Sequence, residues 1–378
     1  MQRNPTLDFI RGAAVLGILL LNIVAFGLPK AAYLNPAWAG ETASGDILTW
    51  ALLDLFAQSK FLTLFALLFG AGLYSQLARG KRWLQTRLSL LVLLGFLHIL
   101  ALWEGDILLS YGLVGLICWR MIRDAQNTRQ LANTGIMLYG IGVAILLLLG
   151  GLQRSGTGRE WQPDAASLID ERLWRIGGGT AGAAHRLDML GENLLALGVQ
   201  YGWLLAGMML TGAALMRSGW LAGRFSQRHY RRCGWVFVSL GMLINGAGIL
   251  GQWRVNWDYR WCAFLLQVPR DISAPFQALG YAALAFGYWP LLSRCAMVPA
   301  VARVGRMALT NYLLQSVLCV GLFWYGGLFM SFSRWQLLAF IPAIWAVNLL
   351  FSTLWLRYFP QGPLEWGWRT LSLRWMQK

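Results

Sequence analysis

Residues 10–28 read IRGAAVLGILLLNIVAFGL, an apolar run whose only polar side chains are those of Arg11 and Asn22. An α-helix needs about 20 such residues to cross the hydrocarbon core of a bilayer. Nine further apolar runs follow, and most approach that length: 48–77, 88–104, 106–119, 132–152, 193–216, 233–252, 273–292, 307–327 and 337–357. The pattern predicts an all-α, polytopic membrane bundle of about 10–11 transmembrane helices, with residues 1–378 forming a single membrane domain.

Composition and charge agree with a membrane protein. With 57% apolar residues and only 13% charged residues, the chain has more apolar surface than a soluble core of this size could hide. Roughly two thirds of the 32 Lys and Arg residues fall at the termini and in the loops that share their side. Basic loops stay cytoplasmic, so we expect both termini to be cytoplasmic in a multi-pass protein of the bacterial inner (plasma) membrane.

The net charge of +16 does not by itself indicate a nucleic-acid partner. The arginines follow the loop topology instead of gathering in one run, and attraction to the anionic headgroups of the lipid bilayer accounts for them. The five cysteines are scattered and form no CxxC pair, so neither a metal site nor a disulfide framework is predicted.

Two regions modify the simple count of spans. The polar, Gly-rich residues 153–192 are expected to form a periplasmic loop, the only one that could hold structure of its own. The run 48–77 is too long for one untilted helix. We interpret 46–58 as an amphipathic surface helix, with Lys60 snorkelling to the interface at the top of a span over 61–77.

Residues 68–73 (LFGAGL) and 210–215 (LTGAAL) resemble one another. Parallel internal repeats would explain the likeness. Small residues at contacts between membrane helices explain it as well, and we favour that interpretation.

The most informative polar residue is His98, about ten residues into the run 88–104. Ionisable side chains are costly inside a bilayer, so they mark candidate functional sites. Trp103, Glu104, Gly105 and Asp106 follow at the turn of a tight hairpin, which can bring the Asp106 carboxylate to the imidazole. A carboxylate bonded to one ring nitrogen orients the ring and leaves the other nitrogen as a base. The alternative is a structural His, with Asp106 only capping the next helix.

The first span carries a second group of polar residues. Asp8 and Arg11 are spaced i, i+3, which predicts a structural ion pair on one helix face. Asn22 lies deeper, where an amide needs a partner on another helix or on a ligand.

The ninth span begins with a polar seam: Thr310, Asn311, Gln315 and Ser316. Arg306, expected near the start of this helix, could hold a phosphate. Interhelical hydrogen bonds and an arginine placed by the membrane topology would explain the same pattern.

HExxH, GxxxxGK[ST] and GxSxG motifs are absent. Five stretches together resemble the YeiB-like bacterial membrane proteins, the family of domain of unknown function 418: Thr6–Gly12, Lys60–Phe65, His98–Asp106, Gly305–Ser316 and Gly362–Trp366. The likeness extends along essentially the whole chain and implies a polytopic inner-membrane protein.

YeiB-like proteins are grouped with membrane acyltransferases of the heparan-α-glucosaminide N-acetyltransferase type, which transfer an acyl group from a coenzyme A thioester. The first-span residues Asp8, Arg11, Gly12 and Asn22 look like that enzyme's opening motif, and residues 305–313 are similar to the start of one of its late helices. Its catalytic His follows span one, where this chain offers Asn35 and no His.

If this chemistry is retained, the resemblance therefore implies His98 as the base and Asp106 as its orienting partner. The other residues would then divide into two sets. An unidentified hydroxyl or amine acceptor would be bound by Asn22, Trp103, Asn311, Tyr312 and Gln315. The acyl-coenzyme A donor, with acetyl as one candidate acyl group, would contact Arg303 and Arg306.

A transporter or flippase that uses the same polar residues as a substrate path is the alternative, and a non-catalytic scaffold is a third. The sequence does not fix the oligomeric state, and a homodimer is compatible with it.

Overall fold

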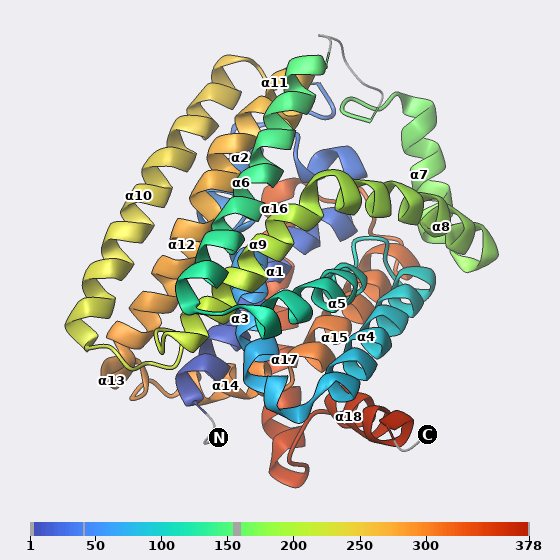
Figure 1. Cartoon of the computed structure of the whole chain (residues 1–378). Coiled ribbons are helices and arrows are strands. Elements are labelled where there is room, and N and C mark those ends of the chain that lie inside the picture. The colour runs from blue at the N-terminus through green and yellow to red at the C-terminus, as the bar shows by residue number, and fades with distance from the viewer. Residues whose placement is uncertain (1–3, 41, 154–159, 377–378) are drawn as a thin grey trace.

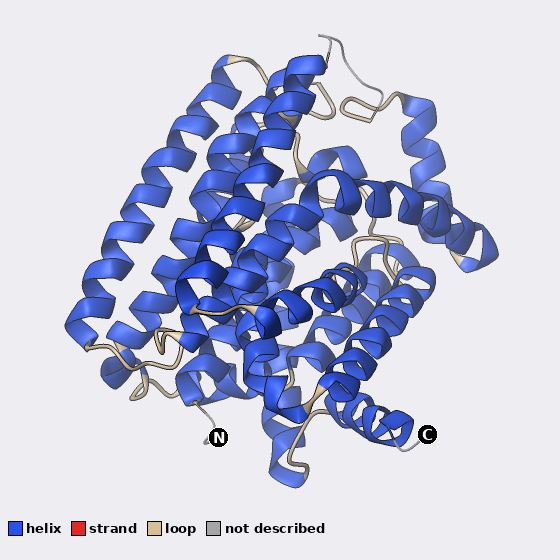
Figure 2. Cartoon of the chain, in the orientation of Figure 1, coloured by secondary structure: helices blue, strands red, loops and turns tan. Residues whose placement is uncertain are grey.

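The computed structural model describes residues 4–40, 42–153 and 160–376, and within them every regular element is helical (Figure 2). A helix forms at each of the ten predicted spans: α1 (Pro5–Gly27), α3 (Lys60–Gln76), α4 (Lys81–Ala101), α5 (Leu108–Asp124), α6 (Thr128–Leu152), α9 (Gly202–Arg217), α10 (Gln227–Arg254), α12 (Val268–Gly287), α15 (Ala308–Cys319) and α17 (Ile341–Tyr358). The remaining α-helices are α2 (Ser44–Phe56), α7 (Ala165–Gly177), α8 (Gly179–Ala196), α11 (Tyr259–Ala263), α13 (Trp289–Leu292), α14 (Met297–Arg306), α16 (Arg334–Leu337) and α18 (Pro363–Met376).

Eight helical stretches of the described chain are long and apolar enough to cross a membrane: 5–27, 44–79, 81–101, 128–152, 179–217, 227–254, 308–325 and 334–358. The two other predicted spans form α5, which has only 17 residues, and α12, which carries Arg270 and Asp271 near its start and Pro275 inside. The prediction of an all-α polytopic membrane bundle is confirmed.

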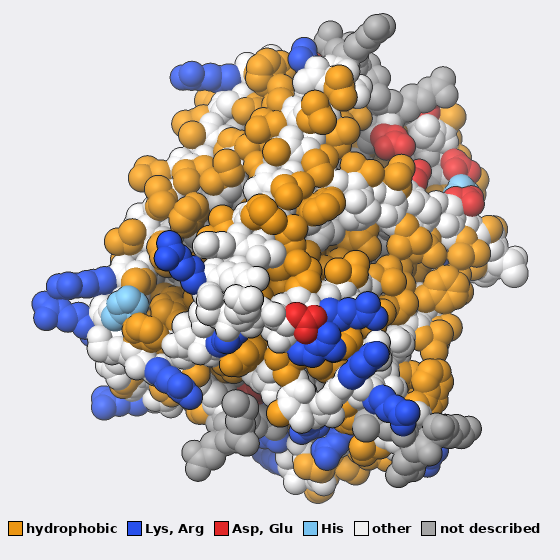
Figure 3. Space-filling model, viewed as in Figure 1, with side chains coloured by type: hydrophobic (Ala, Val, Ile, Leu, Met, Phe, Trp, Pro, Cys, Tyr) orange, Lys and Arg blue, Asp and Glu red, His pale blue; other side chains and the backbone are white. Residues whose placement is uncertain are grey.

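The helices form one bundle in which α10, α12 and α6 lie on one side and α4, α5 and α18 on the other (Figure 1). Both ends of the described chain lie at the same end of the bundle, as the predicted N-in, C-in topology requires. Hydrophobic side chains cover most of the face in Figure 3, while most Lys and Arg lie toward the end with the termini. Several acidic side chains gather at upper right, over α7 and α8.

Glycines set the closest helix crossings. A Cβ added to Gly12 of α1 would lie 2.0 Å from the carbonyl oxygen of Val301 in α14, and one added to Gly305 would lie 1.9 Å from that of Asp8. The similar stretches 68–73 and 210–215 lie on α3 and α9, which pack against each other. There a Cβ on Gly212 would lie 1.9 Å from the Leu67 carbonyl oxygen. Small residues at a helix contact therefore account for the likeness between these stretches.

The expectation that Lys60 snorkels to the interface is wrong, because its side chain is fully buried inside the protein. Its Nζ donates to the carbonyl oxygen of Asp54 (2.6 Å) and lies 4.0 Å from the Asp54 carboxylate. Side chains of α10 and α12 cover the turn between α2 and α3: Asn245 donates to the Asp54 carbonyl oxygen and Gln277 to that of Leu55.

The 153–192 region also has a defined structure where it is described. Asp164 caps α7 by accepting from the Ser167 amide, and α8 continues directly toward α9 through a π-helical turn over Leu197–Tyr201. These helices lie beside the hairpin between α4 and α5.

Candidate functional site

His98 and Asp106 form a buried pair at the hairpin. His98 lies in the last turn of α4, and Asp106 lies just before α5. His98 Nδ1 is 2.8 Å from Asp106 Oδ1, and both side chains are fully buried. The second carboxylate oxygen of Asp106 accepts from the backbone amide of Leu109 (2.7 Å), so Asp106 also caps α5. The same carboxylate therefore caps a helix and contacts the imidazole.

The other ring nitrogen of His98, Nε2, is buried and has no hydrogen-bond partner within the described residues. A buried polar atom without a partner costs about 1–3 kcal/mol, so such an atom needs an explanation. An imidazole that is oriented through one nitrogen and unoccupied at the other has the arrangement of a general base.

Helices α7 and α8 fix the hairpin from the predicted periplasmic side. Arg175 donates to Glu104 (Nη2–Oε1, 2.7 Å), and Asn193 donates to the Glu104 carbonyl oxygen (3.0 Å). Arg186 donates twice to the carbonyl oxygen of Leu100. The hairpin position of Asp106 is thus supported by side chains from a distant part of the sequence.

Trp103 has a packing role in this arrangement. Its buried ring lies 4.3 Å, centroid to centroid, from the ring of Phe26 in α1. It does not line the cavity described next.

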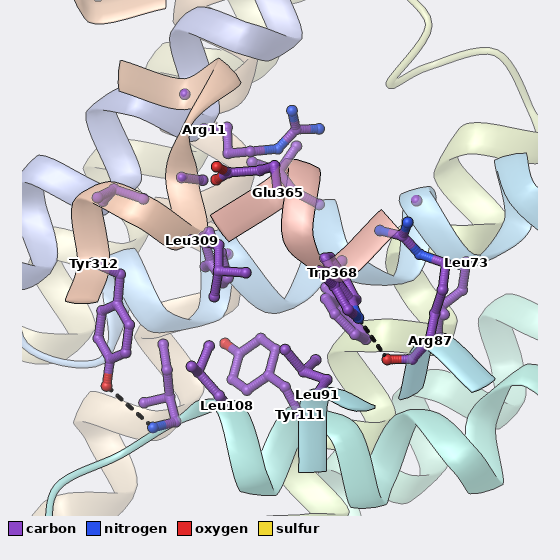
Figure 4. A pocket seen from close by; sticks show the side chains of 18 of the residues that line it. Arg11, Leu73, Arg87, Leu91, Leu108, Tyr111, Leu309, Tyr312, Glu365 and Trp368 are labelled. Carbon is purple, nitrogen blue, oxygen red and sulfur yellow. Dashed lines mark hydrogen bonds between the residues drawn. The ribbon is translucent and has the colours of Figure 1, made fainter. Parts of the chain in front are cut away.

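A cavity of about 300 Å³ lies close to the buried pair. Figure 4 shows side chains that line this cavity. Ile107, the neighbour of Asp106, lines it together with Tyr111 and Tyr312. The Tyr312 ring lies 5.5 Å from the His98 ring, and its hydroxyl accepts from the Ile107 amide (3.2 Å). His98 does not itself line the cavity, so Tyr312 connects the two by contacting both.

Three arginines also line this cavity: Arg11 of α1, Arg87 of α4 and Arg306 of α14. The guanidinium of Arg87 lies 3.7 Å from the centroid of the Trp368 ring, and the Trp368 indole donates to the Arg87 carbonyl oxygen. Leucine, phenylalanine and valine side chains form most of the remaining wall. The cavity therefore combines an apolar wall with cationic side chains (Figure 4).

Arg306 does not lie at the start of a helix as expected. The chain forms a separate helix, α14, that ends at Arg306, and α15 begins at Ala308 after Met307. The start of α15 already holds a carboxylate: Glu365 of α18 accepts from the amide (3.1 Å) and hydroxyl (2.6 Å) of Thr310. Arg306 instead donates to the carbonyl oxygen of Pro360 (3.1 Å) and lines the cavity from the side.

Asp8 and Arg11 form the predicted ion pair, with Arg11 Nη1 3.1 Å from Asp8 Oδ1. Arg303 lies apart from the cavity beside His98. Together with Asp8 and Arg306 it lines a different hollow against α13 and α14.

Asn311 and Gln315 take part in a buried network between helices. Asn311 donates to Ser352 (2.8 Å) and accepts from Asn348 of α17 (2.9 Å), while Gln315 donates to the Asn348 side-chain oxygen (3.2 Å). Neither lines the cavity next to His98, and nor does Asn22, which is half-buried in α1. The structure thus places Tyr312 and Arg306 on the wall of one cavity and the His98–Asp106 pair in contact with Tyr312, and it places Asn22, Asn311, Gln315 and Arg303 elsewhere.

Sequence reasoning missed four residues of this cavity: Arg87, Tyr111, Glu365 and Trp368. The charge pattern of the sequence explains Arg87 simply as one of the basic residues on the expected cytoplasmic side. Glu365 and Trp368 belong to the stretch that carried the family resemblance or lie just beyond it, which was the one available signal. Across the described residues, no group of three or more His, Cys, Asp or Glu side chains is placed to hold a metal ion.

Fold and site together define a polytopic α-helical membrane protein with a buried His–carboxylate pair. The chain is 63% identical to YeiB of Escherichia coli (strain K12), over 99% of this chain and 97% of that protein. It is 28% identical to YxaH of Bacillus subtilis (strain 168), over 98% of this chain and 94% of that protein. Residues 215–374 match the family described as protein of unknown function, DUF418. The chain belongs to this family of YeiB-like proteins. No solved structure matches it.

Proposed function

We propose that this protein is a membrane-embedded acyltransferase that moves an acyl group from a coenzyme A thioester to a hydroxyl or amine acceptor. One observation carries the proposal: an imidazole oriented by a carboxylate at 2.8 Å keeps a buried nitrogen without a hydrogen-bond partner, and its ring contacts Tyr312, which lines a cavity together with three arginines. Acyl transfer needs a base for the acceptor's proton and cations for a phosphorylated donor.

In this mechanism His98 Nε2 takes the proton from the acceptor's hydroxyl or amine as that atom bonds to the thioester carbonyl carbon. The carbon–sulfur bond then breaks, and the proton on Nε2 passes to the departing thiolate. Asp106 keeps its hydrogen bond to Nδ1 throughout, so it orients the ring and stabilises the imidazolium. No atom of the protein is changed at the end of the cycle.

The negative charge that develops on the carbonyl oxygen requires a donor. Tyr312 is the best candidate because its hydroxyl accepts from the Ile107 amide, which leaves its own proton available to a ligand in the cavity. The side-chain amides of Asn311 and Gln315 are less suited to this role, since their hydrogen bonds join α15 to α1 and α17.

The donor would enter from the end of the bundle with both termini, which we propose to be cytoplasmic. Arg11, Arg87 and Arg306 would face its phosphates, and the apolar wall would hold the acyl group. Coenzyme A thioesters are found in the cytosol, so entry of the donor from the cytoplasmic side fits a protein of the bacterial inner membrane.

The test is the binding and turnover of acetyl-coenzyme A by the purified protein in detergent. We expect thermal stabilisation by the donor and release of a free thiol when membrane extract supplies acceptors. Arg306→Ala should weaken binding about tenfold, the effect of losing one charge-assisted contact, while the matched Arg294→Ala should leave it unchanged. Arg294 is exposed and lines no part of this cavity. If acetyl-coenzyme A neither binds nor releases thiol, the proposal fails and a transporter or flippase becomes the better account.

A further inference from the structure

A second polar cavity, of about 240 Å³, lies on another face of α3. Thr63 and Ala66 of α3 line it together with Ser59, which precedes the helix, whereas Phe65, Phe69 and Gly72 line the cavity next to His98. Tyr139, near the middle of the 25-residue helix α6, also lines the second cavity, which places it well inside the bundle. None of its lining residues has a role in the acyl transfer proposed above.

Two opposite charges meet in this second cavity. Arg270 and Asp271 lie near the start of α12, with 4.0 Å between Arg270 Nε and Asp271 Oδ1, which is beyond hydrogen-bonding distance. Their side chains are only about a tenth exposed, at 11% and 10%. Nε of Arg270 has no hydrogen-bond partner among the described residues, and neither has the side-chain oxygen of Gln267, which also lines the cavity. A buried charge or amide that lacks a hydrogen-bond partner is unfavourable, and a bound ligand can supply that partner.

Irregular backbone surrounds the same cavity. Ser59 has a left-handed conformation (φ 64°) at the break between α2 and α3. Gln200 and Tyr201 lie in the π-helical turn before α9, and Gln267 lies in the 3-10 turn before α12. Non-helical backbone at membrane depth occurs where it lines a cavity, and π-helical turns concentrate at functional sites.

The charges of the region define what can bind. Arg270 and Asp271 are the charged residues among those that line it, so the charges of the cavity wall sum to zero. A ligand with net charge would be left uncompensated in this low-dielectric interior. A zwitterion supplies an anion for Arg270 and a cation for Asp271 while adding no net charge.

The rest of the wall is apolar, with Leu146, Leu204 and Met208 among its members. We propose that this cavity binds a small zwitterion of the α-amino-acid type with an apolar side chain. The carboxylate and ammonium of such a molecule are attached to one carbon, and the adjacent Arg270 and Asp271 receive one each. The apolar side chain lies against the leucines.

L-Leucine and two matched analogues test this inference. The purified full-length protein is melted in detergent with L-leucine, with 3-methylbutylamine, which lacks the carboxylate, and with 4-methylpentanoate, which lacks the amine. We expect L-leucine to raise the melting temperature and each analogue to bind at least about tenfold more weakly, because each leaves one buried charge without its partner.

Variants assign the effect to the cavity. Asp271→Asn should weaken L-leucine binding about tenfold or more, and Thr63→Leu should do so by filling space without changing any charge. Asp188→Asn, an exposed carboxylate in α8, should leave binding unchanged. No stabilisation by L-leucine, equal stabilisation by either analogue, or an undiminished effect in Thr63→Leu would each overturn the proposal. Acetyl-coenzyme A binding is measured separately, so failure here does not decide the acyltransferase proposal.

Discussion

Arg175 should be among the most sensitive single positions outside the membrane spans. Its side chain is 1% exposed and pairs with Glu104 (2.7 Å) and Glu171 (2.8 Å), whose side chains are 7% and 14% exposed. Its guanidinium also lies over the rings of Trp174 (4.5 Å) and Trp324 (4.9 Å). We expect Arg175→Met to preserve much of the packing against these rings while leaving Glu104 buried without a cation.

The expected magnitude follows from these burials. Removing one partner of a buried ion pair costs about 3–5 kcal/mol, and within the described structure Arg175 is the cation within 4.0 Å of the Glu104 carboxylate, while Arg186 interacts with it from farther away. The loss of Arg175 should cost less at Glu171 than at Glu104, because Glu171 also accepts a hydrogen bond from the Lys30 backbone amide near the surface. Glu104→Gln should cost less than Arg175→Met, about 1–3 kcal/mol, since Arg175 then keeps Glu171 as a partner. The double variant should be more stable than the sum of the two single effects predicts.

The assay is the free energy of unfolding in mixed micelles titrated with denaturing detergent, followed by tryptophan fluorescence. Arg172→Met is the matched control, because Arg172 lies on the same helix with an exposed side chain. If Arg175→Met lowers the free energy of unfolding no more than Arg172→Met does, the Arg175–Glu104 ion pair does not stabilise the hairpin, and the reasoning is refuted.

Three further predictions concern packing, charge and topology. Gly305→Ala should force α14 away from α1 and lower the melting temperature. Gly367→Ala is the control, because a Cβ there meets nothing within 4 Å, and it should be neutral or slightly stabilising. Equal changes in melting temperature for the two variants would contradict the close contact between α1 and α14. Lys60→Met should cost about 3–5 kcal/mol by leaving the buried Asp54 carboxylate without its cation, and a loss below about 1 kcal/mol would indicate an exposed lysine. In intact cells carrying a variant without native cysteines, an impermeant thiol reagent should label Asp170→Cys but not Phe225→Cys, and the opposite pattern would reverse the membrane topology.

The buried pair could be predicted from the sequence because its determinants are local. His98 and Asp106 are eight positions apart, and a helix that turns back after Trp103 brings them together whatever the rest of the bundle does. The helical spans could be predicted for a related reason, since the length and polarity of each run decide whether it can cross a bilayer.

The rest of the site depends on contacts between distant parts of the chain. Arg87 lines the cavity beside Trp368 of α18, which packs on it from 281 positions away. Lys60 is buried because α10 and α12, and not lipid, cover the turn after α2, and the local sequence does not determine this. Asn311 and Gln315 have the composition of a binding seam, but Asn348 of α17 takes up their hydrogen bonds. Hydropathy along one run contains no information about which neighbour satisfies its polar side chains.

The most direct test of the central claim is the turnover of acetyl-coenzyme A, measured as thiol release, by His98→Gln relative to the unaltered protein. Glutamine retains hydrogen bonding at this position but cannot act as a base, so the fold and donor binding should be preserved. We predict a loss of about 10²–10⁴-fold in turnover with unchanged thermal stabilisation by the donor. Turnover within tenfold of the unaltered protein would contradict the assignment of His98 as the base.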